Sequence, residues 1–214
     1  RLARHNEQRY GVSLQASKGK WGNLFTMNRN KTDNYSVHNG SNPVTRVIAT
    51  IYGDATWNFK EQLTYALSDK LKLIGRAGYF FRQLVRTVET PERYRDFSAG
   101  LRAQWRLSEH DNLEGAYAFD QYDKSDYQRI TRLDIRDYSN VQNSIRLLYH
   151  HSFGGGDVLT AGADYLHDYL FNTNLDGNTR KQDSFDAFAQ YDWSIDNVWE
   201  IVGALRYDYF SDGR

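Results

Sequence analysis

The stretch Leu71–Phe81 reads LKLIGRAGYFF, and the character of its residues alternates along the chain. The odd-numbered positions hold small, aliphatic or aromatic residues, whereas the even-numbered positions include the charged residues Lys72 and Arg76. Phe97–Leu107, FSAGLRAQWRL, repeats the alternation. A period of two is the pattern of a β-strand with one apolar face, so both stretches are predicted to be strands.

The same pattern predicts about ten antiparallel strands along the chain. They are expected at Gln8–Ala16, Trp21–Asn28, Val44–Tyr65, Leu71–Phe81, Phe97–Leu107, Leu113–Gln121, Val141–His150, Val158–Leu166, Phe185–Trp193 and Trp199–Tyr207. Val44–Tyr65 is longer than the others. We expect it to be one projecting strand, with a bend near Gly53 or an extra short hairpin as the alternatives.

The connections between these strands alternate between short turns and long polar loops. Short turns are expected near Ser17–Lys20, Ser68–Lys70, Ser108–Asp111, Phe153–Asp157 and Ser194–Asn197. Long loops are expected near Asn30–Asn42, Gln83–Arg95, Asp123–Asp137 and His167–Gln182. Transmembrane β-barrels have short periplasmic turns and long extracellular loops, so this alternation predicts an all-β antiparallel barrel wall. A large soluble antiparallel sheet is the alternative.

Aromatic residues on the apolar faces favour the membrane interpretation. Trp105, Tyr149, Trp193 and Trp199 lie beside the short turns. Tyr79, Tyr165, Phe185 and Tyr207 lie toward the long loops. Two aromatic girdles around an apolar band are expected where rings sit at the two headgroup layers.

Composition narrows the choice of protein class. The chain has 27 basic and 27 acidic residues, so no clustered positive charge suggests a nucleic-acid partner. No cysteine is present, which excludes disulfides and thiolate metal sites within this chain. The mean hydropathy of -0.76 and the lack of an apolar run of about 18 residues argue against membrane helices. A barrel is compatible, because only alternate residues face lipid.

The phase of the turns predicts where the chain ends lie. The first strand leads into a short turn and the last strand leaves one, so both ends are expected on the extracellular side. Complete bacterial barrels start and end in the periplasm. Residues 1–214 are therefore expected to form a partial outer-membrane barrel domain, the middle of a larger barrel.

Asp183–Asp212, DSFDAFAQYDWSIDNVWEIVGALRYDYFSD, resembles a hairpin of TonB-dependent outer-membrane receptors. The resembling elements are Phe188–Tyr191 (FAQY) and Gly203–Asp208 (GALRYD). Three further segments look like barrel hairpins of the same family: Leu63–Tyr65, Ser68–Leu71 and Arg76–Tyr79. The resemblance implies a barrel of about 22 strands around an N-terminal plug domain. The plug and the TonB-contacting box are absent from this chain.

The resemblance implies a function in the bacterial outer membrane. Such receptors are transporters, not enzymes, and import scarce nutrients such as a ferric siderophore, haem or a corrinoid, using TonB through the plug. Outer-membrane lipid and a surface lipoprotein are further expected partners. A passive porin-type channel is the alternative, and an outer-membrane barrel enzyme, a protease or lipase, is the third reading.

The polar faces of the strands fit a wide, water-filled or plugged interior. Charges there need water or polar protein beside them. They are Lys72, Arg76, Arg102, Arg106, Glu114, Arg146, Asp186, Glu200, Arg206 and Asp208.

Two of the long loops contain candidate ligand contacts. Arg and Tyr suit an anionic, aromatic or metal-chelate ligand. The candidates are Arg86, Arg93, Tyr94, Tyr127, Arg129 and Arg132. Nearby Glu and Asp residues leave a solvated, mixed-charge loop as the alternative.

The segment Asn172–Asp183, NTNLDGNTRKQD, approaches a calcium-binding loop. Asn172, Asn174, Asp176 and Asp183 would supply oxygen ligands. Calcium is thus the one cofactor the sequence suggests. A polar hairpin tip is the alternative, because Asn, Asp and Gly favour turns.

His167 and Asp168 stand where a long loop is expected to begin. His167 could be a haem ligand, or His167 and Asp168 could form an acid–base pair. The alternative is that His167 is an ordinary surface histidine. Neighbouring strand residues point to opposite faces, which weakens a direct dyad.

Overall fold

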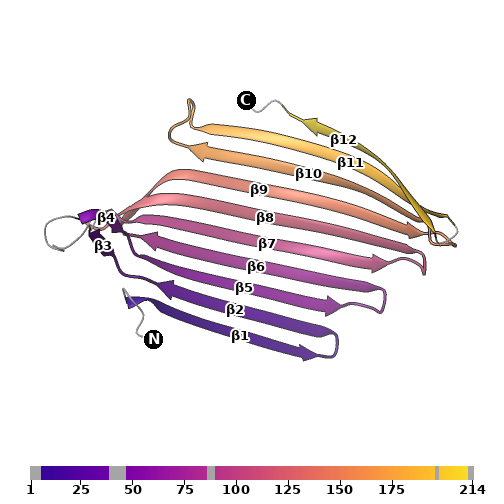
Figure 1. Ribbon diagram of the computed structural model, residues 1–214, viewed down its shortest axis with the longest axis horizontal. Helices are drawn as coiled ribbons and strands as arrows, with labels where there is room; N and C mark the ends of the chain where they lie inside the picture. Colours follow the sequence, from indigo (N-terminus) through magenta and orange to yellow (C-terminus); the bar gives the residue numbers. More distant parts are fainter. Residues whose placement is uncertain (1–5, 39–46, 86–89, 196–197, 212–214) are drawn as a thin grey trace.

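The computed structural model describes residues 6–38, 47–85, 90–195 and 198–211, and these residues form a wide curved sheet (Figure 1). In this part of the chain ten antiparallel strands follow the order β1-β2-β5-β6-β7-β8-β9-β10-β11-β12, and β3 and β4 form a separate hairpin. The bounds are β1 Gln8–Lys18, β2 Trp21–Lys31, β3 Tyr35–His38, β4 Val47–Ile51, β5 Asp54–Ala66, β6 Leu71–Leu84, β7 Glu92–Arg106, β8 Asp111–Gln128, β9 Leu133–Ser152, β10 Val158–Asn172, β11 Thr179–Ile195 and β12 Trp199–Phe210. The expected all-β antiparallel wall is confirmed.

The short turns lie together at one end of the sheet (Figure 1). Backbone hydrogen bonds close them, such as Leu107 N to Asp111 O at 2.9 Å and Phe153 N to Asp157 O at 2.9 Å. Residues 196–197 of the fifth expected turn lie outside the described residues. We call this the turn end and the opposite one, where β3–β4 lies, the loop end.

Two of the four expected long loops are mainly strand. β8 continues to Gln128 and β9 begins at Leu133, so a turn of four residues replaces the loop expected over Asp123–Asp137. Likewise, six residues connect β10 to β11 where His167–Gln182 was expected to be a loop. The prediction of loops there was wrong because it relied on the many polar residues of these segments, although Tyr169 and Phe171 continue one face of β10. Paired backbone groups define them as strands.

The prediction of a single long strand at Val44–Tyr65 is also wrong. Both alternatives, a bend near Gly53 and an extra short hairpin, are confirmed. β4 pairs with β3, the chain bends at Gly53, and β5 then joins the sheet. A Cβ atom at Gly53 would clash with the carbonyl oxygen of Thr32. The Gly53 amide donates to Asn34 Oδ1 at 2.6 Å. The bend therefore depends on a close backbone approach that only glycine permits.

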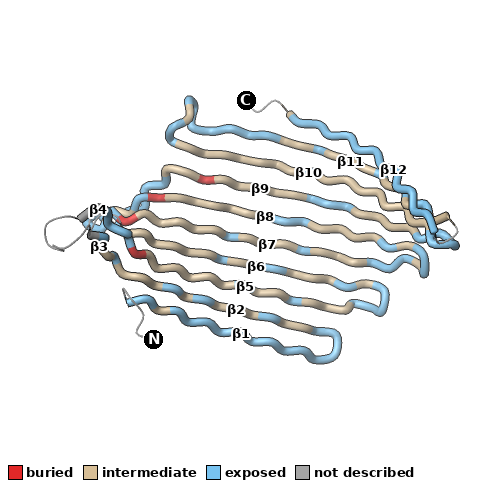
Figure 2. Tube along the Cα trace, viewed as in Figure 1, coloured by how far each residue is buried: buried red, intermediate tan, exposed pale blue. Residues whose placement is uncertain are grey.

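The sheet is a single layer, and no large aliphatic or aromatic side chain among the described residues is buried (Figure 2). The cross-strand register separates its two faces. The face that carries Leu71, Trp105 and Leu113 in one row is apolar, and we call it the exterior face. The opposite face carries Arg76, Arg102 and the charged residues named above, and we call it the interior face. No helix in the described part of the chain is long and apolar enough to cross a membrane.

Candidate ligand-binding mouth

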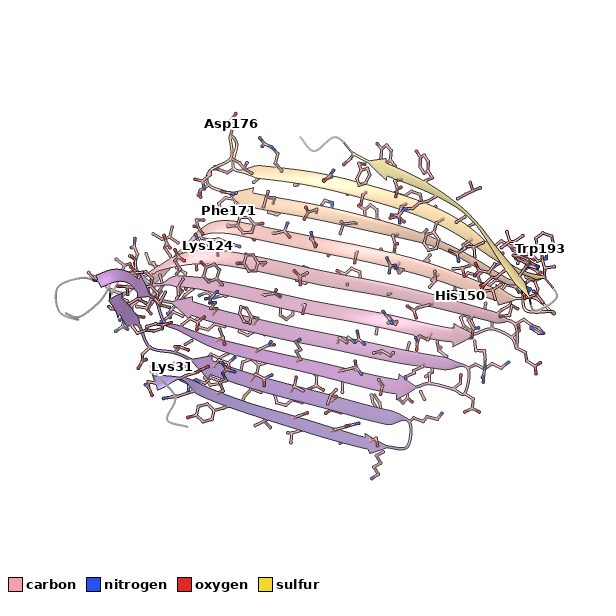
Figure 3. All side chains as sticks on the ribbon, viewed as in Figure 1. Lys31, Lys124, His150, Phe171, Asp176 and Trp193 are labelled. Carbon is pink, nitrogen blue, oxygen red and sulfur yellow. The ribbon has the colours of Figure 1, made fainter. Side chains whose placement is uncertain are left out.

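Five side chains of the interior face gather at the loop end, and we call them the mouth cluster. They are Arg82, Tyr94, Tyr122, Lys124 and Tyr138. The register places them side by side, because Arg82 pairs with Tyr94, Tyr94 with Lys124, and Lys124 with Tyr138. Tyr122 lies two residues from Lys124 on the same face. Figure 3 shows Lys124 at the same end as Lys31 and Asp176, and His150 and Trp193 at the other end.

The three tyrosine rings of the mouth cluster form a continuous aromatic surface. The ring centroids of Tyr94 and Tyr122 lie 6.5 Å apart, and those of Tyr122 and Tyr138 lie 5.9 Å apart, nearly edge to face. The guanidinium carbon of Arg82 lies 5.9 Å from the Tyr94 ring centroid, which is within cation–π range.

Acidic residues hold both cations of the mouth cluster in place. Arg82 Nε donates to Asp54 Oδ2 at 2.8 Å, and Lys124 Nζ donates to Asp137 Oδ2 at 2.9 Å. The Tyr94 hydroxyl donates to Glu92 Oε2 at 2.6 Å. The cluster thus presents aromatic faces with two anchored cations beside them. This chemistry suits a flat or aromatic ligand that carries negative charge.

Of the ligand contacts predicted from the sequence, only Tyr94 belongs to this cluster. Arg93 and Tyr127 do come together, with the Arg93 guanidinium carbon 3.3 Å from the Tyr127 ring centroid. However, they lie on the exterior face, because Arg93 has the same phase along β7 as Phe97. Arg129 and Arg132 are exposed in the β8–β9 turn, and Arg86 lies outside the described residues.

The exterior pair belongs to a compact network that joins β7, β8 and β9. Asp134 binds Arg95 at 2.8 Å and Arg93 at 3.2 Å. The buried Ser125 hydroxyl donates to Asp134 Oδ1 at 3.2 Å and accepts from Arg95 Nη1 at 3.0 Å. These polar groups are hydrogen-bond or ion-pair partners of one another. We therefore assign them a structural role, which is to hold together the ends of β7, β8 and β9 at the loop end.

Sequence reasoning missed Arg82, Tyr122, Lys124 and Tyr138. Lys124 falls in an expected loop, and Arg82, Tyr122 and Tyr138 fall between an expected strand and an expected loop, so none of them was assigned to a face. The alternation of the adjoining strand, extended into these segments, would have assigned each residue to a face. Tyr122 continues the even-numbered face of Glu114, and Tyr138 continues that of Arg146.

All eight residues expected to form girdles lie on the exterior face of the sheet. Seven are exposed, for example Trp199 at 70% and Tyr79 at 39%. The eighth, Tyr149, is half-buried, and its hydroxyl donates to Asp111 Oδ1 at 2.5 Å. The Tyr165 hydroxyl donates to Asp183 Oδ1 at 2.7 Å nearer the loop end. Carboxylates thus partner tyrosine hydroxyls near both borders of the apolar band.

The expected calcium ligands are distributed over two elements. Asn172 Oδ1 accepts from the Asn174 amide within the hairpin tip, and Asp176 lies in the same tip. Asp183 instead lies within β11, where its Oδ1 contacts His167 Nδ1 at 2.7 Å. No group of three or more acidic, histidine or cysteine side chains suited to a metal occurs among the described residues. Calcium binding stays a prediction.

His167 and Asp168 point to opposite faces, as the strand phase indicated. His167 contacts Asp183 on the exterior face, whereas Asp168 Oδ1 accepts from Asn140 Nδ2 at 2.7 Å on the interior face. The two side chains therefore form no acid–base dyad with each other.

Taken together, the curved antiparallel sheet, the apolar exterior with aromatic borders and the charged interior define a segment of a large β-barrel wall. No family model and no curated protein matches the sequence. Solved structures do match its fold. The FrpB iron transporter of Neisseria meningitidis is similar with a TM-score of 0.79 and 12% identity over 96% of this chain.

Two further structures agree. A mutant of the ferric enterobactin receptor PfeA from Pseudomonas aeruginosa is similar over 98% of this chain, with a TM-score of 0.74 and 12% identity. The copper transporter OprC is similar over 95%, with a TM-score of 0.69 and 14% identity. This chain spans 38% of the first two proteins and 35% of the third. The sheet therefore has the fold of the barrel wall of TonB-dependent outer-membrane transporters.

Proposed function

We propose that residues 1–214 form part of the wall of a TonB-dependent transporter in a bacterial outer membrane, which imports a scarce nutrient. The observation that carries this proposal is the match of almost the whole chain to the walls of such transporters. The plug domain and the TonB-contacting segment would belong to parts of the protein outside these residues.

The charged interior supports a wide barrel with a polar filling. Arg146 and Asp164 pair there, as do Arg102 and Glu114, at 2.5 and 3.3 Å. The Arg146 and Arg206 side chains nevertheless remain 61% exposed on this face. Such charges need water or polar protein beside them. A hydrated plug inside the barrel would supply polar partners for them.

The mouth cluster supports a ligand class. Its tyrosine faces and the two cations Arg82 and Lys124 suit an anionic chelate with flat or aromatic parts. A ferric siderophore, haem and a corrinoid all remain candidates for the cargo. A surface lipoprotein that passes ligand to the mouth is a further proposed partner.

The function is tested by uptake in cells that lack the gene. We expect deletion to abolish growth on one iron or cobalamin source, and the full-length gene to restore it. Restoration should require TonB. If restored uptake continues in a strain without TonB, the passive porin-type channel is the correct alternative and the transporter proposal is wrong. Membrane fractionation of the same cells reports the location independently.

A further inference from the structure

Glu61 breaks the apolar pattern of the exterior face. It pairs in register with Ala77 and Phe25, both exterior residues, so its carboxylate points to the side that faces lipid in the proposed barrel. Trp57 and Tyr65 lie four residues from it in either direction on the same face of β5. Each four-residue step spans about 13 Å along the strand. Glu61 therefore lies midway between two aromatic residues of its own strand, and two residues from the row of Phe59 and Tyr79.

Asn23 is the hydrogen-bond partner of Glu61 on the neighbouring strand β2. Its Nδ2 donates to Glu61 Oε1. An asparagine amide has two N–H donors and a carboxylate has two acceptor oxygens. Within the described residues the second N–H of Asn23 and Glu61 Oε2 have no further hydrogen bond. Hydrocarbon chains cannot supply one, so lipid would leave both groups unsatisfied.

An apolar hollow lies beside this pair on the exterior face. Its volume is about 370 Å³, and Gly75, Ala77 and Ala99 form its floor. Leu63, Leu101 and Tyr117 line it, and Glu61 stands at its edge. A Cβ atom at Gly75 would have no atom within 4 Å, which confirms that the space above the floor is open.

The other side of the pair carries protruding side chains. Leu14 of β1 and Trp21 of β2 are 59% and 58% exposed. Leu63, Leu101 and Tyr117 around the hollow are 46%, 55% and 45% exposed, so protruding side chains stand on both sides of Glu61–Asn23, with the hollow on one side. A twofold axis along the membrane normal through the pair would bring Leu14 and Trp21 of one copy against the hollow of the next.

We propose that this surface of β1, β2, β5, β6 and β7 binds a second copy of the same protein within the membrane. The pair is self-complementary in hydrogen bonding. In a twofold dimer the free N–H of each Asn23 meets Glu61 Oε2 of the other copy, and both groups become satisfied. Small residues that allow close approach and polar groups that bond across are what membrane interfaces use. The proposal rests on the membrane placement of this face, and not on the transported cargo.

Cysteine cross-linking tests the interface, because this chain has no cysteine of its own. Phe25→Cys and Leu63→Cys flank the pair and leave it intact. They would be introduced singly into the full-length protein, with any cysteine elsewhere replaced, and oxidised in outer membranes. Leu147→Cys on β9 is the matched control, because Leu147 is exterior and 53% exposed.

We expect disulfide-linked dimers from the first two variants and none from the control. Adding Glu61→Leu should lower the dimer yield about tenfold, through loss of two interchain hydrogen bonds. Three outcomes would each overturn the proposal: equal dimer yields at all three positions, no dimer at any position, or a cross-linked band of another protein's mass. Fractionation of the same cells shows whether the protein reached the outer membrane, so a failure of the location is distinguished from a failure of the interface.

Discussion

Arg146 and Asp164 face each other directly across β9 and β10 and form a two-pronged ion pair on the interior face. Arg146 Nε donates to Asp164 Oδ1 at 2.5 Å, and Nη2 donates to Oδ2 at 2.9 Å. The same row continues through Asp186 to Asp208, so three carboxylates stand opposite one another on adjacent strands. Arg206 approaches Asp208 at 2.8 Å and Asp186 at 3.6 Å.

The first prediction concerns this row. Like charges that lie directly opposite destabilise a sheet, so Arg146→Met should lower the free energy of unfolding of the full-length protein in detergent by about 1 kcal/mol, a modest value because the arginine is solvated. Adding Asp164→Asn should restore part of the loss, because it removes one of the three negative charges. Urea titration of the single and double variants measures both effects. If Asp164→Asn lowers the stability of the Arg146→Met variant further, the carboxylates of Asp164, Asp186 and Asp208 do not repel one another measurably.

The second prediction concerns the mouth cluster. Tyr122→Ala removes the central ring and should weaken binding of the imported ligand about tenfold, while Tyr122→Phe should bind nearly normally. Tyr117→Ala is the matched control, because Tyr117 lies on the exterior face of the same strand and donates to Asn143 Oδ1 at 2.8 Å. Binding to whole cells is the measurement. Equal losses for the two alanine variants would contradict a ligand role for the interior ring.

The third prediction is that the stability of the loop-end part of β7, β8 and β9 depends on pH. This part lies outside the membrane-spanning segments of the proposed barrel. Burial alone would raise the pKa of Asp134, but its bonds with Arg95, Arg93 and Ser125 outweigh burial and lower it below the ordinary value. A lowered folded-state pKa gives stability above the unfolded-state pKa of about 3.9, and this stability is lost as the pH falls through the folded-state value.

Hydrogen exchange of residues 125–135 measures this effect. The wild type should remain protected at pH 7 and lose protection in acid, below the ordinary aspartate range. Asp134→Asn should be less protected already at pH 7 and change little with acid. Asp176→Asn, in another hairpin tip, is the control and should follow the wild type. Full protection of Asp134→Asn at pH 7 would show that the ionised network does not hold the extension.

The fourth prediction concerns the bend before β5. Gly53→Ala places a methyl group against the backbone of Thr32 and should destabilise the segment by about 1–3 kcal/mol. Gly203→Ala is the control, because a Cβ atom there meets nothing within 4 Å. Hydrogen exchange of residues 32–38 and 47–54 reports the local effect. Unchanged exchange in Gly53→Ala would mean that the bend tolerates a side chain.

The strands, their two faces and the positions of the turns were predictable from the sequence, because a period of two depends only on local residue order. Where the strands end was not predictable. The strand ends at the loop end are rich in polar residues, and the pairing of their backbones distinguishes them from loops. The irregular register between Lys124 and Ser125 is likewise invisible in the sequence.

The clusters depend on register, which sequence alone does not specify. Tyr94 was recognised as a ligand candidate from its type, but its neighbours Tyr122 and Tyr138 come from other strands. Arg93 and Tyr127 were predicted as ligand contacts, yet their phase turns them to the exterior. Glu61 and Asn23 are 38 residues apart, and only the pairing of β2 with β5 makes them partners.

In the proposed transporter, the length of the strands at the loop end bears on how the ligand arrives. β9 has 20 residues. In the proposed barrel a membrane crossing uses about half of them, so the other half would extend roughly 25 Å beyond the bilayer at a strand tilt of about 40°. The mouth cluster would therefore lie well above the anionic headgroups. In the proposed transporter, a bulky, hydrated, negatively charged ligand would be captured at that height, before it experiences repulsion from the cell surface, and would then descend inside the barrel.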